Sequence, residues 1–449
     1  MIRNLATALG TVVCLAGAMA PAATAQTAPP SVVFDNVRIF DGTSDRLSPP
    51  ANVLVVGNTI KTISTAPIAA PPGAPVTRIA GGGRTLMPGL IDAHTHIMFE
   101  TLTQEAALTA DLAFVTVAAV KGAHDMLMRG FTSIRDVGGP VLGLKRGIDM
   151  GLVPGPRIWP SGAMISQSGG HGDFRLPTEL PSQPGSFHFS ERIGAAAIAD
   201  SPDTVRQRAR EQLALGASQL KLMAGGGVGS AYDPIDEAQF TVPELRAAVE
   251  AAENWGTYVT EHAYTPRAVQ QAIEAGVKCI DHGQVLDEAT ARLMAERGVW
   301  WSLQPFSDDR PSAFAEGSPK RVKQLEVYGG TDIAYGLAKK FKIKTAWGTD
   351  VLYSAEHAAE QGKQLSKMVR WFTAAEALRM ATAGNAELLA LSGPRNPYPG
   401  RLGVVQEGAI ADLLLVDGDP ITNIALVEDP AKNFLVIMKD GKIYKQLVK

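Results

Sequence analysis

Short apolar runs recur along most of the chain, and helix-like stretches such as 201–215, 241–255, 265–275 and 287–297 separate several of them. Strands and helices that alternate in this way indicate parallel strands joined by crossover helices. The pattern predicts an α/β fold, a closed (β/α)8 TIM-like barrel whose strands all end at one face. We expect its eight strands at residues 90–96, 132–136, 157–161, 219–223, 258–262, 278–282, 299–304 and 344–349.

Residues that bind metals stand in or just after five of these runs. His94 and His96 are two residues apart, so an extended strand presents both imidazoles on the same face. Lys221 lies inside an apolar run, where an unpaired ammonium is costly to bury. Because the barrel brings the strand ends together, the set predicts a two-metal site and a hydrolase. Its members are His94, His96, Lys221, His262, His282 and Asp350.

In these residues the chain resembles the amidohydrolase superfamily, over nearly all of the sequence that follows the N-terminal segment. The resemblance implies two divalent metal ions, with zinc the expected metal. His94 and His96 would hold one ion with Asp350, and His262 and His282 would hold the other. Lys221 would bridge the ions as a carbamate, N6-carboxylysine.

The chemistry of such a centre explains the lysine and the aspartate. A lysine that has reacted with CO2 is an anion, which suits a place between two cations that would repel an ammonium. Two divalent ions roughly 3.5–4 Å apart lower the pKa of a bridging water toward neutrality. Asp350 would take a proton from this nucleophile and pass it to the leaving nitrogen, as general base and acid.

Three further segments resemble one branch of the superfamily: 130–139, 155–162 together with 169–173, and 262–267. This branch holds Xaa-Pro dipeptidase-like enzymes, carboxypeptidases that act on N-acyl and aminoacyl amino acids, and ochratoxin-hydrolysing amidohydrolases. We expect His171, in a glycine-rich loop, to polarise the scissile carbonyl and bind the substrate. A hydrogen bond to Asp173 is its structural alternative. We expect Tyr264 and Arg267 to bind a substrate α-carboxylate.

The resemblance implies an amidohydrolase with carboxypeptidase activity, which releases a C-terminal amino acid by attack of a metal-bridging hydroxide. Hydrolysis of ochratoxin A to ochratoxin alpha and phenylalanine is one expectation, and an Xaa-Pro dipeptidase, or prolidase, is the main alternative. A cyclic amide hydrolase would share all six ligands. A deaminase is disfavoured, because Lys221 is present and no glutamate follows His262 closely. A barrel without catalysis would be expected to have lost some ligands.

Other side chains of the predicted strands have weaker indications. The run 299–306 predicts an aromatic wall for a bulky acyl group, with Trp300 or Trp301 facing the pocket. Arg135 and Asp136 end the second strand, where the charge pair either braces the barrel mouth or binds substrate, and neither residue is assigned a catalytic role. Strand alternation directs Glu261 and Asp281 away from the histidines that follow them, toward the helix layer or behind the ligands.

The ends of the chain predict an exported protein with a second domain. Residues 1–25 have a basic start, an apolar stretch and small residues before a cleavage point after Ala25, which is typical of a secretory signal peptide and of a periplasmic or secreted protein. Residues 26–85 and 395–449 predict a small β-sandwich built from both ends, and 86–394 the barrel. The net charge of -3 gives no basic excess for nucleic acid. We expect a small-molecule substrate, no membrane association after cleavage, and a homo-oligomer, for which the resemblance allows an octamer.

Overall fold

The computed structural model describes residues 29–69, 73, 75–183, 185–230 and 232–448. The predicted signal peptide, residues 1–25, lies outside these ranges. In the described ranges, no helix combines the length and the apolar character that a membrane crossing requires.

All eight predicted barrel strands are present, and their ends lie within two residues of the expected bounds. They are β6 (Leu90–Thr95), β7 (Phe131–Asp136), β8 (Arg157–Pro160), β11 (Leu220–Met223), β12 (Val259–Ala263), β13 (Cys279–His282), β14 (Trp300–Leu303) and β15 (Thr345–Trp347). Two short strands, β9 (Met164–Ser166) and β10 (Ala196–Ile198), lie between β8 and β11. Every pairing among these strands is parallel.

The barrel strands pair in two arcs. One arc has the order β10-β9-β11-β12-β13-β14-β15, and the other has the order β6-β7-β8. Backbone hydrogen bonds join the arcs at both seams, from Ser218 to the Pro160 carbonyl at 2.7 Å and from Asp350 to the His94 carbonyl at 2.9 Å. The second bond brings the end of the last strand directly beside the end of the first.

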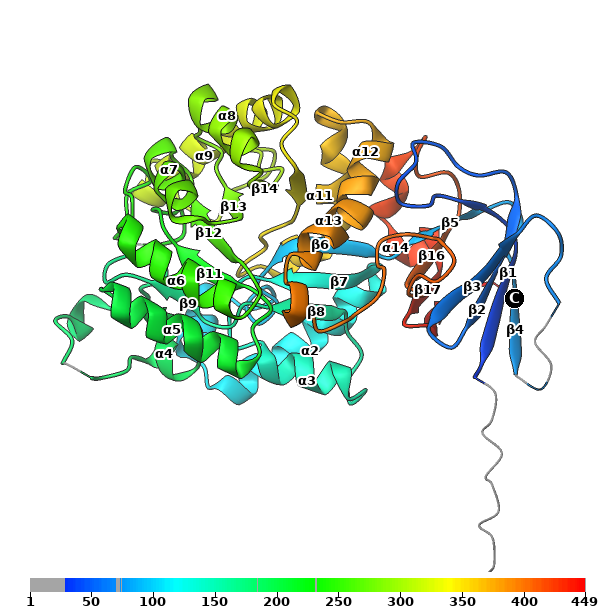
Figure 1. Ribbon diagram of the computed structural model, residues 1–449, viewed down its shortest axis with the longest axis horizontal. Coiled ribbons are helices and arrows are strands. Elements are labelled where there is room, and N and C mark those ends of the chain that lie inside the picture. The colour runs from blue at the N-terminus through cyan, green and yellow to red at the C-terminus, as the bar shows by residue number, and fades with distance from the viewer. Residues whose placement is uncertain (1–28, 70–72, 74, 184, 231, 449) are drawn as a thin grey trace, which may run out of the picture.

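Helices follow most of the strands and surround the barrel (Figure 1). Their side chains and the outward faces of the strands form the largest apolar core, which contains Ile134, Val205, Leu245 and Trp347. The helices are α1 (Gln104–Thr109), α2 (Leu112–Met128), α3 (Leu142–Asp149), α4 (Phe189–Arg192), α5 (Pro202–Leu215), α6 (Val242–Asn254), α7 (Pro266–Ala275), α8 (Glu288–Arg297), α9 (Pro319–Lys340), α10 (Ala355–Ala359), α11 (Gln361–Ser366), α12 (Ala374–Arg379), α13 (Asn385–Ala390) and α14 (Pro430–Asn433).

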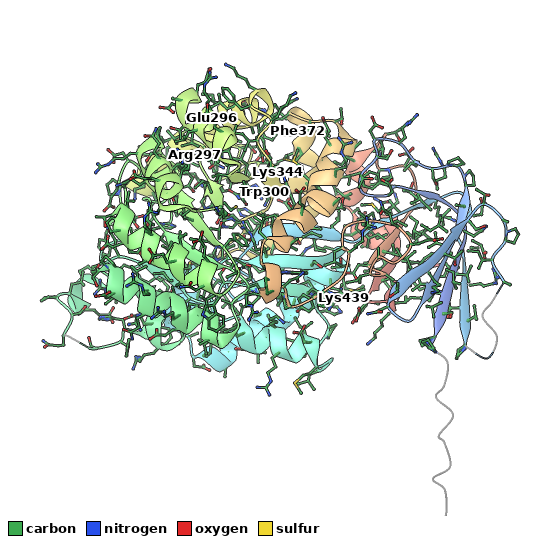
Figure 2. The ribbon with its side chains drawn as sticks, in the orientation of Figure 1. Glu296, Arg297, Trp300, Lys344, Phe372 and Lys439 are labelled. Carbon is green, nitrogen blue, oxygen red and sulfur yellow. The ribbon has the colours of Figure 1, made fainter. Side chains whose placement is uncertain are left out.

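Strands from both ends of the described chain form one eight-stranded sheet beside the barrel, as the blue and red segments of Figure 1 show. Arg157, at the start of β8, donates to both carboxylate oxygens of Asp412 at 2.8 and 2.7 Å, and Lys439, labelled in Figure 2, donates to the Gly155 carbonyl at 2.7 Å. These buried bonds attach the sheet to the barrel. The strands are β1 (Ser31–Ile39), β2 (Ala51–Val56), β3 (Thr59–Ser64), β4 (Val76–Ala80), β5 (Thr85–Pro88), β16 (Leu413–Val416), β17 (Phe434–Lys439) and β18 (Lys442–Gln446).

The lower layer of the barrel interior contains Trp300, which packs with Tyr258 and Cys279 near the start of their strands. The Lys344 ammonium lies 5.3 Å from the centre of the Trp300 ring, and Figure 2 labels both residues. Because strand starts lie opposite the ligand face, Trp300 is not in the pocket. Trp301 points into the helix layer and donates to the His282 carbonyl at 2.6 Å. The prediction that one of these tryptophans faces the pocket is therefore wrong.

Candidate metal centre

The structure brings the six predicted ligand residues together at the carboxyl ends of the barrel strands. They line one cavity of about 290 Å³. The side chains that supply donor atoms are buried, and the most exposed of them, Asp350, retains 16% exposure. The six are His94 and His96 on or just after β6, Lys221 on β11, His262 on β12, His282 at the end of β13 and Asp350 after β15.

Two of the six depart from regular strand geometry. His282 has φ of 77° and Asp350 has φ of 52°, a left-handed conformation that costs a side-chain-bearing residue on the order of 1–3 kcal/mol. On β13, Asp281 already faces the barrel interior, so alternation alone would turn His282 outward. Because His282 has this left-handed conformation, the side chains of Asp281 and His282 both face the barrel interior. Gly348 allows the approach of Asp350, because a Cβ there would lie 2.6 Å from the His94 backbone nitrogen.

Asp350 is the shared neighbour of the first histidine pair. Its Oδ1 lies 3.2 Å from His94 Nε2 and 3.5 Å from His96 Nε2. The nearest donor atoms of His94, His282 and Asp350 all lie within 4.8 Å of one another, which is the spacing of ligands around one cation. Asp350 therefore contacts both histidines of this pair, but the group with the spacing for one cation contains His282 rather than His96. The sharing of the six ligands between two ions stays a prediction.

His96, His262 and His282 are each oriented by a hydrogen bond from the ring nitrogen that points away from the cavity. Such bonds fix the ring and select which nitrogen faces the centre. His96 and His282 use Nδ1 in this way and present Nε2, whereas His262 uses Nε2 and presents Nδ1. The pairs are His96 with the Gly138 carbonyl at 2.9 Å, His262 with the Gly226 carbonyl at 3.0 Å, and His282 with Gln304 Oε1 at 2.7 Å.

A buried charge network lies directly below the ligands. Asp281 accepts from Lys221 Nζ at 2.5 Å, from Arg135 Nη2 at 2.5 Å and from Thr260 Oγ1 at 2.8 Å. Its Oδ1 is also 3.3 Å from His94 Nδ1. Asp281 thus lies behind the ligands, one of the two places that the sequence allowed. Arg135 spans the barrel interior from β7, so its predicted place at the mouth is wrong.

Glu261, which directly precedes His262 on β12, differs from Asp281 in having no charged hydrogen-bond partner among the described residues. Glu261 is fully buried, and neither of its oxygens has a hydrogen-bond partner in the described part of the chain. Burial raises the pKa of Glu261 well above its ordinary value, despite the charge of Lys221. Its carboxyl is therefore expected to be neutral, and we assign it no part in the site.

Burial and charge set the protonation of four ligands in the direction that metal binding needs, whereas at His94 burial acts to lower the pKa but the charges of Asp350 and Asp281 outweigh it and raise the pKa. Burial holds the pKa of His282 down at about 3 and that of His262 well below its ordinary value, so both imidazoles are neutral. Burial also lowers the pKa of Lys221, although Asp281 opposes the shift, and this favours the amine that reacts with CO2. At Asp350 burial acts to raise the pKa, but His94 and His96 outweigh it and hold the pKa well below the usual range.

The donor set fits a pair of divalent cations. Neutral imidazoles and a carboxylate are ligands for zinc and similar ions. Both ring nitrogens of His94 are buried, and neither makes a well-formed hydrogen bond to any residue in the described ranges. A buried polar atom without a partner indicates an absent ligand or ion. The two ring nitrogens of His94 are therefore the atoms that most clearly indicate a bound metal ion.

The predicted substrate-binding residues are not all in the cavity. His171 and Tyr264 line it. Tyr264 is 4% exposed, and its ring stacks on that of His282 with 5.1 Å between centres. Arg267 is exposed on α7 and is not among the described residues that line the cavity, because the chain turns outward into that helix after Tyr264. The expected pairing of Tyr264 with Arg267 is therefore corrected.

The sequence indicated only some of the other residues that line the cavity. Arg310 and Lys367 line the wall, with Arg310 Nη1 2.7 Å from Glu360 and Lys367 Nζ 2.6 Å from Asp309. Phe306 lies above His282 with 6.3 Å between ring centres, and other aromatic rings extend this wall. The sequence indicated the wall through Phe306 but gave no signal for Arg310, which follows strand β14 in an irregular loop.

A barrel with such ligands on these strands defines a class of metal-dependent hydrolases. Residues 85–445 match the model of the amidohydrolase family, and the chain belongs to that family. The ochratoxinase of Aspergillus niger is 31% identical over 377 residues, which cover 80% of this chain and 75% of that relative. The chain is accordingly a hydrolase that acts on amide bonds.

Solved structures give the same family. A prolidase complexed with N-methylphosphonate-L-proline is 34% identical, with a TM-score of 0.83 and coverage of 93% of this chain and 100% of that chain. The structure of A. niger ochratoxinase is 26% identical, with a TM-score of 0.80 and coverage of 93% and 96%. These neighbours have the barrel and a β-rich second domain, which confirms the predicted fold class.

Proposed function

We propose that this chain is a binuclear metal-dependent carboxypeptidase that cleaves the amide bond to a C-terminal amino acid. The observation that carries the proposal is the convergence of the six ligand-type side chains on one buried cavity. Its substrates would be N-acyl or aminoacyl amino acids. We also propose that the protein is exported and works with zinc.

Two metal ions held by the six residues would supply an activated water and polarise the substrate carbonyl. The chain's own groups would do the rest. Asp350 is ionised and touches both histidines of β6, so it is placed to accept a proton and return it to the leaving nitrogen. His171 lies across the cavity, where its ring would bind the carbonyl or the amide of the substrate.

The α-carboxylate of the substrate needs a cation in the cavity. In the described ranges, the arginine and lysine side chains that line the cavity outside the ligand set are Arg310 and Lys367. Arg310 keeps 23% of its side chain exposed beside Glu360, so part of its guanidinium is accessible. We assign the carboxylate to Arg310, with the Tyr264 hydroxyl as a second donor. Arg267 is exposed on α7 and is not among the described residues that line the cavity.

The acyl side of the substrate would meet an aromatic wall. The rings of Tyr264, His282, Phe306 and Tyr328 stack in sequence, with interplanar angles of 25°, 18° and 26°. Phe306 and Tyr328, beyond the ligand His282, give this side of the cavity an aromatic wall against which a planar acyl group can pack. This favours a bulky aromatic acyl amide, such as an N-acyl phenylalanine or ochratoxin A. The similarity to a prolidase supports the second candidate, an Xaa-Pro dipeptidase.

A hydrolysis panel distinguishes the two candidates. Zinc-loaded enzyme is incubated with N-acyl phenylalanines, ochratoxin A and Xaa-Pro dipeptides, and free amino acid is measured. Release of phenylalanine from the bulky amides supports the carboxypeptidase with an aromatic wall. Release of proline alone supports the prolidase. If neither phenylalanine nor proline is released, cyclic amides are the next substrates to test.

A further inference from the structure

Neighbouring groups hold the His171 ring in one orientation. Its ring stacks face to face on that of His262, with 4.1 Å between centres and 16° between planes. Gly227 lies on the ring so closely that a Cβ there would be 2.0 Å from Cε1 of His171. The backbone N–H of His171 donates to Gln239 Oε1 at 3.0 Å. The ring is therefore confined to one plane above a predicted metal ligand.

One edge of this ring faces a buried carboxylate. His171 Nδ1 lies 3.0 Å from Asp233 Oδ2 and 2.8 Å from Ser230 Oγ. Asp233 has no exposed side-chain area and accepts a second bond, from the Gly227 backbone N–H, at 2.6 Å. The sequence-based alternative for His171, a bond to Asp173, is not what the structure contains. Asp173 instead pairs with Arg175.

The carboxylate is itself fixed in place. Lys323, from α9, donates to the carbonyl of Asp233 at 2.5 Å and to that of Gly227 at 3.0 Å. Burial acts to raise the pKa of Asp233, but the bonds from His171 and Ser230 and the charge of Lys323 outweigh it and hold the pKa below its ordinary value. Asp233 is therefore an anion that faces Nδ1 of His171.

We propose that Asp233 is a positioning residue, which keeps a proton on Nδ1 of His171 and so turns Nε2 toward the reacting amide. A carboxylate accepts hydrogen bonds only, so the nitrogen beside it must be the donor. With Nδ1 bonded to Asp233, Nε2 is the ring nitrogen left to face the substrate amide. This inference rests on the proposed function for its catalytic consequence, but the proton position does not depend on the substrate.

The proton position is tested by NMR on the zinc-loaded full chain labelled with 15N-histidine. The shifts of the two ring nitrogens distinguish a protonated Nδ1 from an unprotonated one, and His171→Asn identifies the signal among the eight histidines. We expect a protonated Nδ1 in the wild type and an altered pattern in Asp233→Ala. Unchanged His171 shifts in Asp233→Ala overturn the proposal, whatever the substrate proves to be.

The catalytic consequence is tested by a double-mutant cycle on amino acid release. We expect Asp233→Ala to lower kcat by about 10- to 100-fold, the usual effect of removing an orienting partner, with KM and zinc content nearly unchanged. In a His171→Asn background the same substitution is expected to have no further effect, because it acts through His171. Additive losses in the cycle, or a loss of bound zinc in Asp233→Ala, indicate a merely structural role and overturn the proposal.

A matched control lies three residues away in the same loop. Asp236 is exposed. Asp236→Ala removes an equal charge without touching the ring, so we expect it to match the wild type in both experiments. If the wild type releases no amino acid from any amide, the proposed function fails, and the NMR result still decides whether Asp233 holds the Nδ1 proton.

Discussion

Asp350 Oδ1 lies 3.2 Å from His94 Nε2, and the Asp350 backbone N–H donates to the His94 carbonyl at 2.9 Å. The two residues thus meet through both side chain and backbone at the seam between β15 and β6. Asp92 reinforces the seam, because it accepts from Thr349 Oγ1 at 2.7 Å and from the backbone of His94 at 3.0 Å. The same bonds that join the ends of the barrel also place a carboxylate beside the predicted metal ligands.

Asp350→Asn removes the proton acceptor but keeps a ligand oxygen and the shape of the side chain. We expect the variant to bind zinc, and kcat to fall by about 10²–10⁴-fold, the usual contribution of a general acid–base group. Zinc content and steady-state kinetics measure the two effects separately. A variant that keeps its rate assigns proton transfer to another group.

Lys221→Ala removes the proposed bridging carbamate. We expect the zinc content and the activity both to fall, and short carboxylic acids to restore part of each by occupying the vacated space. Lys344→Ala, which removes an exposed lysine at the opposite end of the barrel, is the control and is expected to behave as wild type. Full activity in Lys221→Ala contradicts the carbamate.

Arg310→Met removes the cation that we assign to the substrate carboxylate. A hydrogen bond to a charged group contributes about 1.5–3 kcal/mol, so we expect KM to rise ~10- to 100-fold with a smaller change in kcat. Substrates whose C-terminus is amidated are expected to show no such difference. If Arg267→Met raises KM and Arg310→Met does not, the assignment made from the sequence holds instead.

Glu100→Gln tests a buried carboxyl outside the ligand set. Burial raises the pKa of Glu100 to about 8, and Arg129, 3.8 Å away, opposes the shift only in part. The folded protein therefore keeps a proton that the unfolded chain releases near pH ~4.3. From that pH up to about 8, the free energy of unfolding falls as pH rises, because the folded state binds more protons.

The variant lacks this dependence. We expect the free energy of unfolding of the variant to fall less than that of the wild type over the same window. The two proteins are expected to differ by up to a few kcal/mol, at ~1.4 kcal/mol for each unit between the folded and unfolded pKa of Glu100. Urea unfolding of the metal-free protein at both ends of the window measures the effect. Parallel curves for the two proteins would show that Glu100 titrates normally.

The sequence predicted the barrel strands and the convergence of the ligands because both depend on local patterns. Apolar runs locate strands, and a parallel barrel places their carboxyl ends together whatever the loops do. His94 and His96 lie together because alternation is regular at that point. The same rule did not predict that Asp281 and His282 both face the interior, because the positive φ of His282 cannot be read from residue types.

Loops and long side chains account for the rest of what the sequence missed. Asp233 reaches His171 from a loop 62 residues further along the chain, and no periodicity links the two. Arg135 was expected at the mouth, but its long side chain extends into the barrel to Asp281. Arg267 follows a ligand closely in sequence, yet the helix that begins at Pro266 carries it to the surface.

The number of metal ions that activity requires tests the central claim most directly. Metal-free enzyme is titrated with zinc, and release of free amino acid from an amide found in the substrate panel is followed against bound zinc. We predict that the activity rises until two zinc ions are bound per chain and that Lys221→Ala does not reach that state. Full activity with one ion or with none would contradict a binuclear centre built from these six residues.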